Sequence, residues 1–167
     1  MNHPRSIWIA GIGVACVGML ILQTMNRDER IIRQKIDDLI ARCEKKPGRG
    51  VFQTLASAAD LRAFFMPEAI LKLGKPYPAQ LAARELPPLI ARAQLELESL
   101  HITLNGVEFL PRTAPGQAET RLAIELKARR GETAERFLDE YRVRWQKIDG
   151  DWKIADARSD SSIQPTW

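Results

Sequence analysis

The sequence predicts an α+β domain that follows one membrane-spanning helix. Residues 7–25 contain no charged side chain, and a run of this length and character is typical of a transmembrane helix. Apolar residues then recur mostly at helical spacing as far as Leu100, and alternate with polar residues after it. Helices followed by an antiparallel meander make an α+β fold.

Composition and charge are those of an ordinary globular protein. The 167 residues are 45 % hydrophobic and 28 % charged, and the net charge is +4. The acidic residues all follow Asn26 and mix with basic ones, so no clustered basic face is expected and nucleic acid is not an expected partner. On a continuous helix Cys16 and Cys43 would lie about 40 Å apart, which excludes a disulfide within one chain.

Residues 7–25 are predicted to be an uncleaved membrane anchor behind a short tail, residues 1–6. Nineteen helical residues span roughly 28 Å, close to the thickness of the hydrocarbon core of a bilayer. The run does not end in small residues, so a cleaved signal peptide is the weaker interpretation, as are a lipoprotein and a buried helix. The residues that characterise this anchor are Trp8, Gly11, Gly13, Cys16, Gly18 and Leu22.

The small and aromatic residues of the anchor have ordinary roles in membrane helices. Trp8 suits the interfacial aromatic belt. The glycines suit either the usual composition of membrane helices or close packing against another membrane helix, and the sequence leaves both open.

The charges that flank the anchor leave the side of the membrane open. Arg5 precedes the span, and four basic residues follow it between positions 27 and 35. Counted in this way, the positive-inside rule places the domain in the cytoplasm. A short tail with one arginine and a free amino group is instead the usual start of an anchor whose C-terminal domain is exported. This favours a periplasmic domain on a bacterial inner membrane.

The soluble part, residues 26–158, is expected to begin with helices. The apolar stripe of the first ends at Cys43, and a Pro-Gly pair follows it. The second carries Phe64 and Phe65 on its apolar face and is limited by Pro67. The expected elements are helices at residues 32–43 and 57–66, a short strand at residues 69–73, and a helical region at 79–99. Pro87-Pro88 divides that region into a short helix and a longer one that begins at Leu86 or Pro87.

Four alternating runs after Leu100 predict the strands of the meander. Turn signals separate them, including an Asp-Gly pair at Asp149. Trp145 and Trp152 lie on the apolar side of the last two runs and are expected to pack in the core or at a subunit interface. The runs are residues 101–110, 121–127, 137–146 and 152–155, and residues 159–167 are expected to form a tail.

Residues 141–154, YRVRWQKIDGDWKI, resemble the terminal hairpin of the nuclear transport factor two-like (SnoaL-like) superfamily. The order of elements over residues 28–158 is similar as well. The resemblance implies a cone: a strongly bent antiparallel sheet wrapped around three helices, in some members with a pocket at the wide end. It implies no single activity, because the superfamily includes isomerases, dehydratases, cyclases, epoxide hydrolases and members without catalysis.

The chain departs from the catalytic pattern of one branch of that superfamily. Members that resemble ketosteroid isomerase carry a general base just after the first strand and a tyrosine on the first helix. Leu73 stands at the position that corresponds to the base, and leucine cannot transfer a proton. The first helix predicted here contains no tyrosine.

Three residues are weak candidates for acid–base chemistry. Asp156 continues the alternation of Trp152 and would share its face, where burial would raise the pKa of the carboxyl; otherwise it reaches solvent or pairs with Arg158. Tyr141 is a candidate phenolic donor, although a core tyrosine is favoured. His101 is expected at a strand edge. No spacing of histidine and cysteine indicates a metal site, and no cofactor is expected.

The sequence favours a non-catalytic docking or assembly module, held at a membrane as an accessory subunit of a larger complex. Its expected partners are membrane lipid and either another protein or a second copy of the chain. Membrane-anchored assembly proteins of type IV secretion systems share this layout by analogy. The alternative is a binder of a small apolar molecule, or an isomerase, dehydratase or hydrolase that uses a pocket in the cone. An open apolar cavity that contains Asp156 would favour the alternative.

Overall fold

The computed structural model describes residues 27–45, 50–74, 79–112 and 114–160. The chain divides into two compact units, Met1–Gln34 and Lys35–Trp167, and the second contains the sheet. A helix over residues 27–43, called the first helix below, passes from one unit to the other. The predicted anchor, residues 7–25, lies outside the described residues, and none of the helices that are described is long and apolar enough to cross a membrane.

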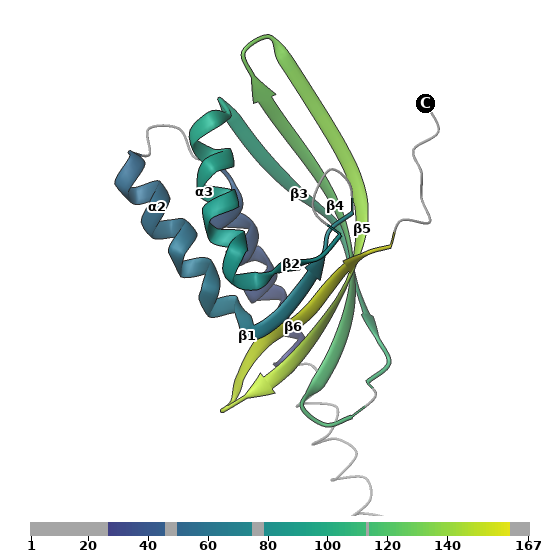
Figure 1. Cartoon of the computed structure of the whole chain (residues 1–167). Helices are drawn as coiled ribbons and strands as arrows, with labels where there is room; N and C mark the ends of the chain where they lie inside the picture. Colours follow the sequence, from purple (N-terminus) through teal and green to yellow (C-terminus); the bar gives the residue numbers. More distant parts are fainter. Residues whose placement is uncertain (1–26, 46–49, 75–78, 113, 161–167) are drawn as a thin grey trace, which may run out of the picture. The chain divides into compact units, whose positions relative to one another are not determined.

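The second unit is a six-stranded sheet with helices on its inner face, so the predicted α+β class is confirmed (Figure 1). The strand order is β2-β1-β6-β5-β4-β3; β1 runs parallel to β6, and every other neighbouring pair is antiparallel. The strands are β1 (Phe65–Lys72), β2 (Leu81–Ala82), β3 (Ser99–Leu110), β4 (Gln117–Arg130), β5 (Thr133–Ile148) and β6 (Asp151–Ser159).

The helices of this unit are residues 35–43 of the first helix and two further α-helices. Each of the two is joined to a 3₁₀ turn. In α3 the two prolines stand in the first turn, where a missing backbone N–H costs nothing. The elements are α2 (Val51–Ala59), η1 (Asp60–Phe64), η2 (Ala83–Glu85) and α3 (Leu86–Glu96).

The predicted second helix is wrong at its end. Phe65, expected on a helix, is the first residue of β1, and β1 begins four residues earlier than the predicted strand. Pro67 explains the difference, because a proline disfavours helical conformation at the residue before it and so pushes the chain into an extended path. Phe64 and Phe65 are nevertheless both buried, at 8 % and 7 % exposure.

The two tryptophans of the terminal hairpin lie deep in the core. Trp152 on β6 is fully buried, and Trp145 on β5 donates its Nε1–H to Oγ1 of Thr120 at 3.0 Å. The turn between these strands uses the Asp-Gly pair, with φ of 49° at Asp149 and 84° at Gly150. Positive φ at both central residues is the geometry of a type I′ hairpin turn, whose twist matches that of the strands.

Side chains from other elements hold the first helix in place within the second unit. The Gln94 amide nitrogen, on α3, lies 2.7, 2.8 and 3.1 Å from the carbonyl oxygens of Arg42, Cys43 and Glu44, so it caps the C-terminal end of that helix. Lys35 lies 2.7 Å from the Asp151 carboxylate at the start of β6. The hydrogen bond from Lys35 holds the pKa of Asp151 below its ordinary value.

Candidate functional site

The inner face of the sheet and the helices enclose a partly open cavity of about 170 Å³. Its walls come from the first helix, from α3, and from strands β1, β4, β5 and β6. The described lining residues are Ile36, Leu39, Ile40, Phe65, Leu71, Leu73, Leu86, Leu122, Ile124, Tyr141, Val143, Trp145, Ile154 and Ala157.

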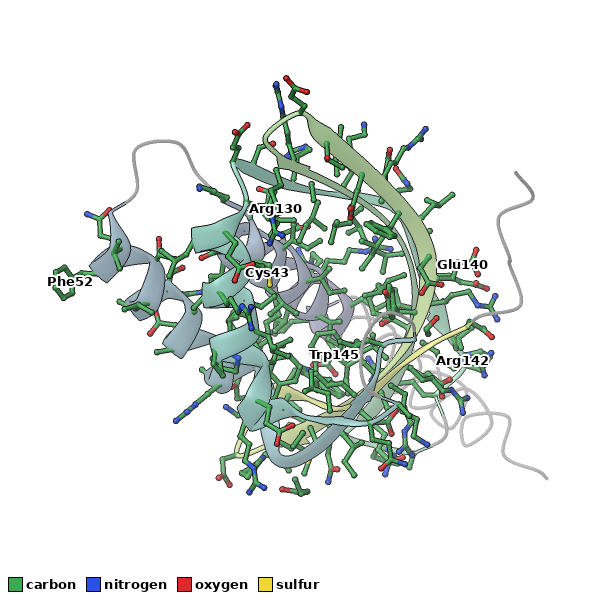
Figure 2. All side chains as sticks on the ribbon, turned by 45° about the horizontal axis from the view of Figure 1, so that its top comes forward. Cys43, Phe52, Arg130, Glu140, Arg142 and Trp145 are labelled. Carbon is green, nitrogen blue, oxygen red and sulfur yellow. The ribbon has the colours of Figure 1, made fainter. Side chains whose placement is uncertain are left out.

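The alternation of strand side chains builds the largest wall of this cavity. Tyr141, Val143 and Trp145 are alternate residues of β5 and point to one face of the sheet. Leu122 of β4 stands opposite Tyr141, so it shares that face. Figure 2 shows Trp145 on the inner side of the curved sheet, whereas Glu140 and Arg142 lie on its outer side. The cone is therefore not filled by its own aromatic side chains.

The lining is apolar apart from two aromatic side chains. The indole N–H of Trp145 already donates to Thr120. The remaining polar group in the described lining is the phenol of Tyr141, on a residue that is half-buried. Leu73, at the position where the sequence resemblance would put a general base, also lines the cavity. The lining thus offers almost entirely apolar contact, and its described residues contain no carboxylate or imidazole.

Asp156 does not line the cavity, so the face predicted for it is wrong. The partner of Arg144 on β6 is Asp156, whereas the partner of Trp145 is Ile154, which leaves Ala155 as an extra, bulged residue. The bulge shifts the alternation, so that Ile154 and Ala157 face the cavity. The Asp156 carboxylate forms an ion pair with the Arg144 guanidinium on the outer side of the sheet.

His101 lies on the edge strand β3, away from the cavity lining. Its side chain is 67 % exposed, and its Nδ1 lies 2.6 Å from Oε1 of Glu44, at the end of the first helix. The same oxygen accepts a hydrogen bond of 2.9 Å from the backbone N–H of Ile102. The structure therefore does not bring His101, Asp156 and Tyr141 together.

Asp139 is a polar residue next to lining residues of the cavity, and the sequence alone did not indicate it. It is two residues before Tyr141 on β5 and stands opposite the lining residue Ile124. Its carboxylate accepts hydrogen bonds from the Ser159 hydroxyl at 2.7 Å and from the Glu140 backbone N–H at 2.8 Å. The sequence feature that could have indicated Asp139 is its position in the alternation of β5, where the residues on either side of it on the same face, Phe137 and Tyr141, are aromatic.

The described residues contain no group of three or more histidine, cysteine, aspartate or glutamate side chains that could hold a metal ion. The candidate site of this unit is accordingly the apolar cavity, with the Tyr141 ring in its wall.

No family model and no curated protein matches the sequence. Several solved structures match the fold at low sequence identity. A scytalone dehydratase-like protein from Novosphingobium aromaticivorans superposes with a TM-score of 0.69 at 12 % identity, over 85 % of this chain and 89 % of that one. A type 2 hexachlorocyclohexane dehydrochlorinase gives 0.63 at 10 % identity, over 83 % and 88 %.

A nuclear transport factor 2-like superfamily protein from Salmonella enterica gives a TM-score of 0.65 at 10 % identity, over 85 % of this chain and 96 % of that one. Identities this low carry information about architecture only. Together with the six-stranded curved sheet and its helices, they show that residues 35–160 have the nuclear transport factor 2-like fold.

Proposed function

We propose that the domain binds a small apolar molecule in the cavity between the sheet and the helices. The observation that carries this proposal is a cavity of about 170 Å³ whose lining is apolar apart from Tyr141 and Trp145. An engineered cavity of roughly 150 Å³ lined by leucine, isoleucine and phenylalanine stays dry and binds benzene or xenon. The expected ligand is thus about the size of one aromatic ring or a short branched alkane.

The cavity favours this binding role over the docking role that the sequence suggested. The docking prediction rested on the anchor and on the lack of a catalytic constellation, and a filled cone would have favoured it, whereas the cone holds open space. Two structures with the same fold are named for a dehydratase-like protein and a dehydrochlorinase, which supports a cavity for a small molecule.

Acid–base catalysis receives less support than binding. Proton transfer requires a group within hydrogen-bond reach of the reacting atom. The described lining offers only the Tyr141 phenol, and both Asp156 and His101 lie elsewhere. We therefore assign the cavity to the binding of an apolar ligand.

Filling the cavity is expected to abolish ligand binding. Ala157→Leu adds a branched side chain to the lining. We expect it to weaken the binding of single-ring compounds at least about tenfold, because the leucine side chain and the ligand would occupy the same space. Trp145 lies in the wall, so ligand binding should change the tryptophan fluorescence, and this change should be absent in a Trp145→Phe chain. The matched control is Ala123→Leu on β4, opposite Glu140 and so on the outer side of the sheet, which should leave affinity unchanged.

Two results would contradict the proposal. One is that no compound in a panel of single-ring and short-chain aliphatic molecules changes the fluorescence or the ligand-observed NMR spectrum. The other is that Ala157→Leu, folded as judged by circular dichroism, binds as the unmodified chain does. Tyr141→Phe keeps the aromatic ring in the lining and should leave the affinity for hydrocarbon ligands within about twofold of that of the unmodified chain.

We further propose that the domain works at a membrane, held there by residues 7–25. The support is the uncharged, span-length sequence of this segment, and the periplasmic face of a bacterial inner membrane remains the favoured side. The full chain is expected to stay with the membrane pellet after a carbonate wash, whereas a chain that begins near Asp28 should be soluble. Full-length protein with an intact N-terminus in the soluble fraction would contradict the anchor.

A further inference from the structure

The inner face of the sheet becomes more exposed from one end of the cavity to the other. Trp145, Tyr141 and Phe137 all point to this face, because β5 pairs with β4 without interruption and its side chains alternate. Trp145 is 2 % exposed, Tyr141 is half-buried, and Phe137 is 47 % exposed. On β4, Thr120 is fully buried and Ile124 is half-buried. The cavity is therefore closed at the Trp145 end, and its open side lies towards Phe137.

Beyond the cavity, the inner face continues as an apolar strip on three strands. Ile124 lines the cavity, and Leu126 is the next residue of β4 on the same face. Leu126 stands opposite Phe137 of β5 and opposite Ile102 of β3. Leu104 stands opposite Ile124. The strip is defined as Ile102, Leu104, Leu126 and Phe137, and its first three members are half-buried.

Asp139 interrupts the strip on β5 but leaves it open on β4 and β3. Its carboxylate accepts hydrogen bonds from the Ser159 hydroxyl at 2.7 Å and from the Glu140 backbone N–H at 2.8 Å. Ser159 belongs to β6, which lies on the side of β5 away from β4. The apolar path from the cavity to Phe137 therefore passes over Ile124 and its β3 neighbour.

The strip makes the apolar surface longer than a ring-sized ligand needs. Tyr141 and Phe137 are four residues apart on one strand, which corresponds to roughly 13 Å. Figure 1 shows the β4–β5 hairpin continuing beyond the end of α3. A molecule the size of one ring fills the cavity of about 170 Å³ and leaves the strip in contact with water. A narrow, elongated apolar group can occupy both.

We propose that the cavity and the strip together bind one straight hydrocarbon chain, with its end near Trp145 and its remainder along Leu126 and Phe137. This inference rests on the proposed function and names the ligand class of the same site. Each methylene that leaves water is stabilised without needing a polar partner, which suits an almost entirely apolar surface. A second copy of the chain fits less well, because the strip is continuous with a cavity that only a slender group can enter.

Straight-chain primary alcohols from pentanol to dodecanol test the proposal. The full chain is held in a bile-salt detergent, which has no long alkyl tail, and affinity is expressed against the free alcohol concentration. We expect affinity to rise about fourfold for each methylene that enters the cavity. Longer members should still gain about twofold for each methylene, because a group on the open strip keeps one side in water. Without the strip, the rise would stop once the cavity is full.

Phe137→Ala separates the strip from the cavity, because Phe137 does not belong to the described lining. It should weaken dodecanol binding about fivefold and leave pentanol binding unchanged. The matched control is Leu138→Ala, since Leu138 is the adjacent residue, is 59 % exposed and points to the opposite face of β5. This control should leave the affinity for both alcohols unchanged.

A free fatty acid and a single-tailed membrane lipid both carry such a chain. Dodecanoate and a dodecanoyl lysophospholipid present the same chain on different head groups, so the tighter binder of the two identifies the source. Phe137→Ala should weaken both about fivefold, as it does dodecanol.

Three outcomes would overturn the inference, and they distinguish it from the proposed function. If pentanol binds but affinity stops rising for longer alcohols, or if Phe137→Ala binds dodecanol as the unmodified chain does, the cavity is a binding site and the strip is not. If no alcohol and no single-ring compound binds, the proposed function fails as well. A dimer in sedimentation that Phe137→Ala dissociates, without a change in dodecanol affinity, would assign the strip to a second copy of the chain.

Discussion

Replacement of Trp152 by alanine is expected to lower the free energy of unfolding by about 3–5 kcal/mol, the range for truncation of large aromatic residues in cores. The side chain is fully buried on β6. Two cations also lie near its ring, Lys147 Nζ at 5.6 Å and Arg112 Cζ at 6.0 Å from the centroid. The indole therefore contributes both apolar burial and electrostatic contacts that alanine cannot replace.

Chemical denaturation of a chain that begins near Asp28, followed by circular dichroism, measures this loss. The matched control is Phe52→Ala on α2, because Phe52 is 89 % exposed and its truncation should change the free energy of unfolding by less than about 0.5 kcal/mol. A loss below about 1 kcal/mol for Trp152→Ala would mean that the terminal hairpin does not pack against the core as described.

The Cys43 thiol is expected to react with a thiol reagent about a thousandfold more slowly at pH 8 in the folded protein than in denaturant, because only the thiolate is reactive. Burial, and to a smaller extent the neighbouring Glu44 carboxylate, raise the pKa of this thiol from 9.0 to about 12. Figure 2 shows Cys43 in the space between the helices and the sheet. The measurement uses a Cys16→Ser chain, so that Cys43 is the only thiol.

The same shift sets a direction for stability at alkaline pH. The folded state favours the neutral thiol, so the stabilising contribution is complete below the unfolded pKa near 9 and is lost as the pH rises towards 12. Cys43→Ala should therefore lose less stability than the unmodified chain between pH 9 and pH 11. Rapid modification of the folded protein at pH 8 would contradict the raised pKa.

The elements that the sequence predicted well are those with strong local signals. The Asp-Gly pair at Asp149 predicts the hairpin turn, because few residues accept positive φ. The Asn105-Gly106 pair is of the kind found at turns and bulges, and the irregularity of β3 lies there, between Leu104 and Gly106. The prolines at the start of α3 predict where that helix begins.

The parts that the sequence did not predict depend on contacts between distant residues. The bulge at Ala155 contains no glycine or proline, so nothing local indicates it, yet it decides on which face Asp156 lies. The cavity is the space left between side chains of six elements. Residue spacing along the sequence cannot predict it, because it depends on how closely those elements pack. Asp139 was overlooked because its neighbours in the alternation are apolar and its role appears only beside Ile124 and Ser159.

The bulge at Ala155 is also a position at which one residue can be deleted without reversing the faces of the side chains on β6. Loss of this one codon would turn the β5–β6 ladder into a regular one, with Ile154 still opposite Trp145 and Asp156 still opposite Arg144. Every side chain of β6 would keep its face, whereas loss of codon 153 would turn Trp152 outwards. A bulge also bends and twists its strand, so the shorter chain would carry a flatter sheet. Descendants of this gene could therefore inherit the same facing residues around a differently shaped cavity through a single in-frame deletion.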